Sequence, residues 1–199
     1  MFAIEDPSQV KPMPKHAKKV FVGKITDVWQ WEQELFDGSQ AIFERISRPD
    51  YAYLIGVLPD KQILLVEDEQ PDRGSVITPA GGKVDDGEDP RDAAMREMME
   101  ETGYEAQEVI HWHSYRPSSK AEMLTHAFIG RNIRKVSDPH LEPGEKNSLL
   151  IVTFDEFLNL GMNPRLRDWL LRIKLLEAQI DPNKKKELKH VLYGPDDKN

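Results

Sequence analysis

The chain has 199 residues, of which 39% are hydrophobic, so it can bury one good core and we expect a single domain. Its 35 acidic residues outnumber 27 lysines and arginines, and the net charge of −8 argues against a nucleic-acid partner. The sequence has no cysteine, no leader and no apolar run of the roughly 18 residues that span a membrane, which excludes disulfides and thiolate sites, so we expect a cytoplasmic protein with no membrane partner.

The first part of the chain predicts an arm followed by antiparallel strands. Residues 1–18 contain prolines and lysines with little periodicity, and they predict an N-terminal arm. Residues 19–48 are rich in β-branched and aromatic residues and contain a turn at 36–39, so they predict a β extension built from hairpins. Apolar strands at 51–58 and 62–66 then lead towards a glycine loop.

That glycine loop runs into a predicted helix at residues 90–102. Asp89 is a good N-cap, Pro90 suits the first helical position, and Gly103 supplies the left-handed conformation that ends a helix. The signals for the loop, for the start of the helix and for its end therefore all support a helix at these residues.

The predicted helix carries a cluster of carboxylates. Glu97 lies three and four residues before Glu100 and Glu101, so the three side chains crowd one helical face. A solvated acidic face is the simpler interpretation of such a cluster. Beside a tight loop, however, grouped oxygen ligands suit a hard divalent cation, and we expect Mg²⁺, with Mn²⁺ as the alternative.

The remaining chain predicts more strands and two helices. Residues 181–199 alternate lysine with acidic residues and predict a charged C-terminal tail in solvent. Strand runs interleaved with helices favour an α/β fold with a mixed β-sheet. The expected strands are 105–114, 121–131 and 147–154, and the expected helices are a short one from residue 154 and an amphipathic one at 165–180.

The fixed residues of the loop and helix match the signature of the Nudix hydrolases. The pattern is Gly-x5-Glu-x7-Arg-Glu-φ-x-Glu-Glu-x-Gly-φ, where φ is usually aliphatic, and Tyr104 is its one loose fit. The chain therefore resembles this family. The resemblance implies a Nudix-type α/β/α sandwich at residues 49–180, preceded by an N-terminal antiparallel strand extension at 19–48 that acts as a dimerisation element.

The resemblance also implies roles for the residues of this motif, residues 82–104, which is called the Nudix box. The implied metal ligands are Glu97 and Glu101, Glu100 directly or through water, and the carbonyl oxygen of Gly81. The implied structural support of the site is an Arg96–Glu88 ion pair together with Gly82 and Gly103.

Weaker similarities point to the ADP-ribose and nucleoside-diphosphate-sugar pyrophosphatases. They are the N-terminal strands, the Arg48-Pro49-Asp50 segment, and a late acidic loop at 142–145 followed by a strand. In that branch a glutamate of the late loop acts as the catalytic base, which implies Glu145, with Glu142 as the substitute. Relatives carry Gln-Tyr-Arg where this chain has Gln70-Pro71-Asp72-Arg73, which puts a phosphate contact by Arg73 in doubt.

The branch implies metal-dependent hydrolysis of ADP-ribose or a related nucleoside diphosphate sugar, to a nucleoside monophosphate and a sugar phosphate, by a homodimer. The alternatives are a nucleoside triphosphate pyrophosphatase of the same family and a non-catalytic nucleotide-sensing Nudix domain. The implied substrate contacts are Trp29, Trp31, Arg45, Arg48, Gln70 and Arg73.

Overall fold

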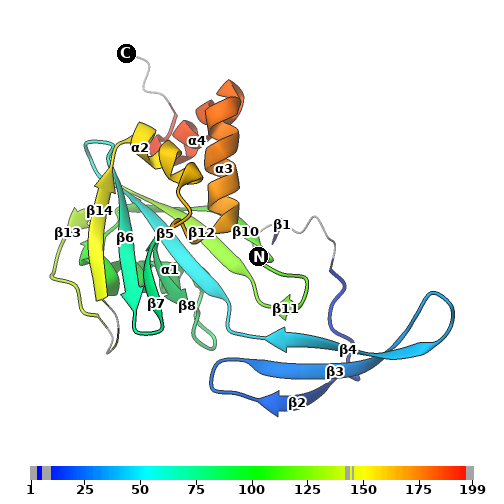
Figure 1. The fold of residues 1–199 in the computed structure, drawn as a ribbon. Coiled ribbons are helices and arrows are strands. Elements are labelled where there is room, and N and C mark those ends of the chain that lie inside the picture. Colours follow the sequence, from blue (N-terminus) through cyan, green and yellow to red (C-terminus); the bar gives the residue numbers. More distant parts are fainter. Residues whose placement is uncertain (1–3, 6–9, 142–143, 145, 196–199) are drawn as a thin grey trace.

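A computed structural model describes residues 4–5, 10–141, 144 and 146–195, and its centre is a mixed β-sheet (Figure 1). Its path runs in the order β1-β10-β12-β5-β6-β14, with β7 paired to β6 and β8 to β5. The pairs β1–β10 and β12–β5 are parallel, and the other pairs of this sheet are antiparallel. The strands are β1 (Ile4–Glu5), β5 (Tyr51–Val57), β6 (Ile63–Gln70), β7 (Arg73–Thr78), β8 (Ala80–Lys83), β10 (Glu108–Tyr115), β12 (Thr125–Arg131) and β14 (Lys146–Val152).

Helices cover both faces of this sheet, which confirms the α/β/α sandwich. On one face α1 (Pro90–Thr102) packs through Ala93, Ala94 and Met98 against alternate residues of β5 such as Leu54. Buried leucines of the other helices pack on the opposite face against Ile55 and its neighbours. These helices are α2 (Phe154–Asn159), the 3₁₀ turn η1 (Leu160–Met162), α3 (Trp169–Ile180) and α4 (Pro182–Tyr193) (Figure 1).

The sheet forks between its two central strands. β5 and β6 pair only at Gly56↔Leu64 and Val57↔Ile63, and beyond that point they separate. The chain fills the fork with β7, which pairs with β6, and β8, which pairs with β5, joined through Pro79. The glycine loop thus lies inside the fork, where backbone groups of β8 are not all used by a neighbouring strand.

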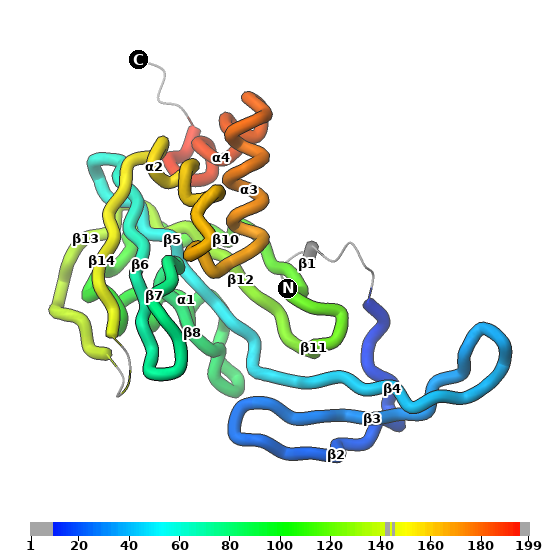
Figure 2. The backbone as a smooth tube through the Cα atoms, viewed as in Figure 1, coloured from blue at the N-terminus to red at the C-terminus, as the bar shows by residue number. Residues whose placement is uncertain are grey.

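A second, smaller sheet stands off the main one (Figures 1 and 2). Its order is β11-β4-β3-β2, and the parallel pair Ala121↔Ile46 joins it to the domain. The antiparallel β extension expected from the sequence is present. The strands are β2 (Lys18–Val22), β3 (Asp27–Glu34), β4 (Gln40–Ser47) and β11 (Ala121–Glu122), and a further pair is formed by β9 (Tyr104–Glu105) and β13 (Arg134–Lys135).

The two faces of the small sheet differ in exposure. The register places Phe21 beside Val28 and Ile46 on one face, together with Ile42, and the side chains of Phe21, Ile42 and Ile46 are exposed. The opposite face carries Trp31, which is buried. Exposed apolar side chains on one face of a protruding sheet are a feature of surfaces that contact other proteins.

The C-terminal segment differs from the expected charged tail. Residues 182–193 form α4, and its Leu188 and Leu192 are buried in the core. The sequence pattern did not indicate this helix because its lysines dominate the local composition. They lie on the outer side of α4, whereas the two leucines, four residues apart, share the side that faces the core. Among the described residues, no helix combines the length and apolar character that crossing a membrane requires.

Candidate active site

Local signals set the bounds of α1 and therefore the direction of its carboxylates. The side chain of Asp89 accepts a hydrogen bond of 2.9 Å from the amide of Arg91, which caps the first turn. At the other end Gly103 has a φ of 75°, and its N–H donates to the carbonyl of Met99 at 2.8 Å. With the buried side of α1 fixed on the sheet, Glu97 and Glu101 face β8.

Glu97 and the glycine loop are in close contact. A Cβ atom added to Gly82 would lie 2.2 Å from Oε1 of Glu97, so only glycine leaves room for this carboxylate. Glu101 is 8% exposed, and its Oε2 accepts a hydrogen bond of 3.0 Å from the amide of Gly81. Two carboxylates of α1 therefore meet the backbone of β8 at adjacent residues.

Tyr51 also reaches this point, although its place at the start of an apolar strand carried no signal of a role in the sequence. Its hydroxyl donates a hydrogen bond of 2.8 Å to the carbonyl oxygen of Gly81. Burial, and after it the negative charge of Glu101, raise the pKa of this phenol. The Tyr51 side chain thus remains a neutral donor at the edge of the carboxylate pair.

Arg96 links the helix to the glycine loop. Its guanidinium donates to both oxygens of Glu88, at 3.0 and 3.1 Å, and to the carbonyl of Lys83 at 3.2 Å. It also contacts Glu97 at 2.7 Å and Glu100 at 3.1 Å. These bonds hold the pKa of Glu88 below its ordinary value and raise that of Arg96. The expected pair is present, and the side chain of Arg96 in it is 32% exposed.

The donors suit a divalent cation. Within the part of the chain that the structure describes, no three Asp, Glu, His or Cys side chains are grouped closely enough to hold a metal ion as they stand. Arg96 contacts both Glu97 and Glu100, and the Glu100 side chain is 45% exposed. Glu97, Glu101 and the Gly81 carbonyl are nevertheless oxygen donors of the kind that hard cations take. The space beside Gly82 would be filled by any side chain. These residues therefore fit a metal site.

The implied catalytic glutamates, Glu142 and Glu145, lie outside the described residues. The segments that flank them are anchored beside α1 and β6. The amide of His140 donates to the carbonyl of Glu100 at 2.7 Å. Lys146, the first residue of β14, forms a 2.8 Å ion pair with Glu69 of β6. One end of this loop thus starts beside the carboxylate helix, and the other starts beside β6.

The aromatic and basic candidates of the N-terminal strands are partly engaged within the small sheet. Trp31 is 7% exposed, and the guanidinium of Arg45 lies 5.5 Å from its ring centre and pairs with Glu122. Trp29 is half-buried and donates to Ser47 at 2.9 Å, whereas Arg48 is exposed. Trp29 and Trp31 lie on β3, Arg45 lies on β4 and Arg48 directly follows β4, in the sheet that protrudes from the domain (Figure 1).

The other two candidates lie at the turn between β6 and β7. Gln70 ends β6, and Arg73 begins β7 and forms an ion pair with Asp68. Arg73 also donates to the carbonyl of Asp68 at 3.3 Å. Its guanidinium is therefore tied to its own hairpin.

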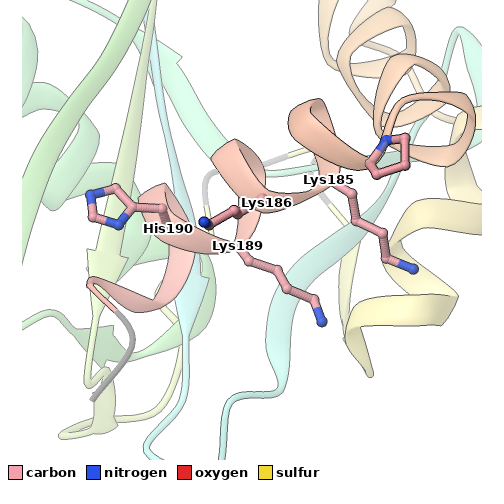
Figure 3. A pocket seen from close by; sticks show the side chains of 5 residues that line it. Lys185, Lys186, Lys189 and His190 are labelled. Atoms are coloured by element: carbon pink, nitrogen blue, oxygen red, sulfur yellow. The ribbon is translucent and has the colours of Figure 1, made fainter. Parts of the chain in front are cut away.

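A surface pocket on α4 lies apart from the carboxylates (Figure 3). Its volume is about 230 Å³. It lies on the helix layer opposite α1, and in the close view Lys185 and Lys189 point to one side while His190 points to the other. Because these side chains diverge, they do not meet at a single ligand. The lining residues are Pro182, Lys185, Lys186, Lys189 and His190.

Comparisons with known proteins identify a family whose domain includes α1 and β8. A family model described as the NUDIX domain matches residues 48–173. The methanol dehydrogenase activator of Bacillus methanolicus is 28% identical over 167 residues, which cover 81% of this chain and 90% of that protein. The ADP-ribose pyrophosphatase of Bacillus subtilis (strain 168) is 25% identical over 146 residues, which cover 72% of this chain and 79% of that protein.

A solved structure described as an ADP compounds hydrolase superposes with a TM-score of 0.71 at 18% identity, covering 90% of this chain and 94% of that one. Its likeness establishes the α/β/α fold. Because the family model spans more than half of the sequence, the chain belongs to the NUDIX family, and it is a hydrolase of that family. Nudix hydrolases generally use divalent metal ions.

The contact between Gly82 and Glu97 predicts the effect of a single methyl group. In Gly82→Ala the new Cβ displaces the Glu97 carboxylate, which moves at little cost to the fold because it is the end of a flexible side chain. We expect affinity for a divalent cation to fall at least about tenfold, or about 1.4 kcal/mol, in calorimetric titration, with Tm nearly unchanged.

Gly74→Ala on β7 is the matched control, because a Cβ at Gly74 meets nothing within 4 Å. It should bind the cation as the wild-type protein does. Equal metal affinity in Gly82→Ala and Gly74→Ala would show that Glu97 is not a ligand.

Proposed function

We propose that this Nudix hydrolase cleaves the diphosphate of ADP-ribose or a related nucleoside diphosphate sugar into a nucleoside monophosphate and a sugar phosphate, using Mg²⁺ or, as the alternative, Mn²⁺. The observation that carries the proposal is the meeting of Glu97, Glu101 and the Gly81 carbonyl inside the fork of the sheet. The similarity to a protein named ADP-ribose pyrophosphatase supports the choice of substrate.

The residues of the box divide the work between binding and orientation. In the proposed site Glu97, Glu101 and the Gly81 carbonyl hold the metal, with Glu100 directly or through water. A divalent cation held there supplies charge neutralisation at the diphosphate and lowers the pKa of the attacking water. Arg96, bonded to Glu88 and Lys83, holds the helix and the loop at a fixed separation, so the ligands keep their direction.

A base is still required to take the proton from the water. We assign this role to Glu145, with Glu142 as the substitute, since both belong to the loop whose flanks are anchored at Glu100 and Glu69. In-line attack on phosphorus then releases the two monophosphates without a covalent enzyme intermediate.

Substrate contacts are proposed from two regions. Gln70 and Arg73 lie at the β6–β7 turn of the same chain. Trp29, Trp31 and Arg48 are proposed to act, with Arg45, at the site of a partner subunit, because the sheet that carries β3 and β4 protrudes from its own domain (Figure 2). The resulting assembly is a homodimer.

Two other functions are less well supported. A triphosphate pyrophosphatase shares the box, but the β extension and the late acidic loop favour a diphosphate sugar. A non-catalytic nucleotide sensor does not need the carboxylates that hold a catalytic metal ion, whereas every fixed carboxylate of the box is present here. The cysteine-free sequence fits the proposed cytoplasmic location.

A substrate panel tests the proposed activity. A ligand with about two negative charges should enter an acidic protein more easily than a triphosphate with about four. We expect kcat/KM for ADP-ribose, or for a nucleoside diphosphate hexose, to exceed that for any nucleoside triphosphate at least about tenfold, measured as release of nucleoside monophosphate.

The Glu101→Gln variant keeps the shape of the side chain but removes a charged ligand, so it serves as the control for contaminating phosphatases and should lose turnover by orders of magnitude. A triphosphate at the head of the panel, with pyrophosphate released, would reject the proposed substrate class.

The catalytic base is tested by two substitutions. Glu145→Gln should lower kcat by about 10²–10⁴ with little change in metal affinity, because it removes proton transfer and no ligand. Glu142→Gln on the same loop is its matched comparison. A large loss in Glu142→Gln and none in Glu145→Gln would reverse the assignment.

The dimer is tested by light scattering at micromolar concentration. We expect twice the chain mass of 22.9 kDa for the wild-type protein and a monomer for Ile42→Asp, which places a charge on the exposed apolar face of the small sheet. Ile180→Asp is the control, because Ile180 is also an exposed isoleucine but lies on α3. A fully active wild-type monomer would exclude the shared site.

A further inference from the structure

Tyr51 holds one end of the glycine loop without belonging to the box. It is the first residue of β5 and pairs with Lys83 in the β5–β8 ladder, while Gly81 pairs with Tyr53. Its side chain extends along the strand, and its hydroxyl donates to the Gly81 carbonyl oxygen at 2.8 Å. This bond therefore connects the side chain of one central strand to the backbone of β8 inside the fork.

The peptide groups on both sides of Gly81 are each hydrogen-bonded to a side chain. The N–H of Gly81 donates to Glu101 at 3.0 Å, and its carbonyl accepts from Tyr51. Because a glycine has no side chain to restrain it, these two bonds set the direction of its backbone groups.

A carbonyl oxygen has two lone pairs, so one hydrogen bond leaves the second for a cation. The bond from Tyr51 is therefore compatible with the role of Gly81 as a neutral ligand. An O–H donor on one lone pair also restricts the plane in which a metal can approach the other.

We propose that Tyr51 is a positioning residue of the metal site, which holds the Gly81 carbonyl in the direction that a divalent cation needs. The role rests on the metal site of the proposed function and extends it to a residue outside the Nudix box. Tyr51 acts only through Gly81 and does not touch the substrate.

The chain offers a close control in Tyr53. Tyr51 and Tyr53 lie two residues apart on β5 and share a face of the strand, with ring centres 6.4 Å apart. Tyr53 is almost completely buried. Tyr53→Phe thus removes a phenol oxygen from the same strand and face but leaves the bond between Tyr51 and Gly81 intact.

The experiment compares wild-type protein, Tyr51→Phe and Tyr53→Phe by calorimetric titration with Mg²⁺ and with Mn²⁺ alone. The loss of one hydrogen bond to a ligand predicts affinity about three- to tenfold weaker in Tyr51→Phe. The metal concentration for half-maximal activity should rise by the same factor, while kcat at saturating metal stays within about threefold of the wild type. Tyr53→Phe should bind metal within about twofold of the wild type.

Unchanged metal affinity in Tyr51→Phe would overturn the proposal, and so would an equal loss in Tyr53→Phe, which would indicate a general packing effect. A collapse of kcat at saturating metal would also overturn it, because Tyr51 would then act on the reaction itself. The thermal midpoint of each variant identifies a damaged fold.

The experiments distinguish a wrong substrate from a wrong role for Tyr51. If the wild-type protein binds metal but cleaves no nucleoside diphosphate sugar, the substrate is wrong, and the affinity ratio of the two variants still decides the role of Tyr51. If the wild-type protein binds no divalent cation, both proposals are rejected.

Discussion

The site depends on how closely α1 approaches β8. The helix can bring the Glu97 carboxylate against the strand only because position 82 has no side chain, and the amide of Gly81 is close enough to bond Glu101. Arg96 then ties the same helix to the far end of the loop through Glu88. The contact of Glu97 with Gly82, the bond between the Gly81 amide and Glu101, and the Arg96–Glu88 ion pair all constrain the distance between α1 and the glycine loop. A shift of the helix by the width of a methyl group would disturb all three.

The forked sheet makes this approach possible. In a continuous sheet the backbone groups of a central strand bond to both neighbours, and none remain for side chains or ions. Here β5 and β6 share only two residue pairs, so the chain between them can present the Gly81 amide and carbonyl to Glu101 and Tyr51. The irregularity of the sheet is thus what makes the Gly81 carbonyl accessible as the proposed backbone ligand.

The sequence predicted well what depends on near neighbours in the chain. The bounds of α1 follow from Asp89, Pro90 and Gly103, and the structure reproduces them. The placing of Glu97 and Glu101 on the face towards β8 also needs only the helical period, whereas the Glu100 side chain is 45% exposed.

Features that depend on distant segments were not predicted. Tyr51 and Gly81 are 30 positions apart, and only the β5–β8 pairing brings them together. Helix α4 was misread because the free energy of burying Leu188 and Leu192 comes from a surface formed by other elements, while its lysines dominate the local pattern. The interior position of Trp31 likewise depends on the opposite strand rather than on its own segment.

The small sheet has a strand at its border whose backbone groups are open to addition of another chain. Among the described strands of that sheet, β2 is at the edge, and all five of its residues are exposed. Such an edge, which carries the exposed Val20, Phe21 and Val22, can recruit unrelated extended segments and start aggregation. Lys18 and Lys19 lie at one end of this strand, and Lys19 forms a 2.6 Å ion pair with Asp27 of β3. Charged edge residues disfavour indiscriminate strand addition, so the pair of lysines protects the border of the sheet while its apolar face remains available.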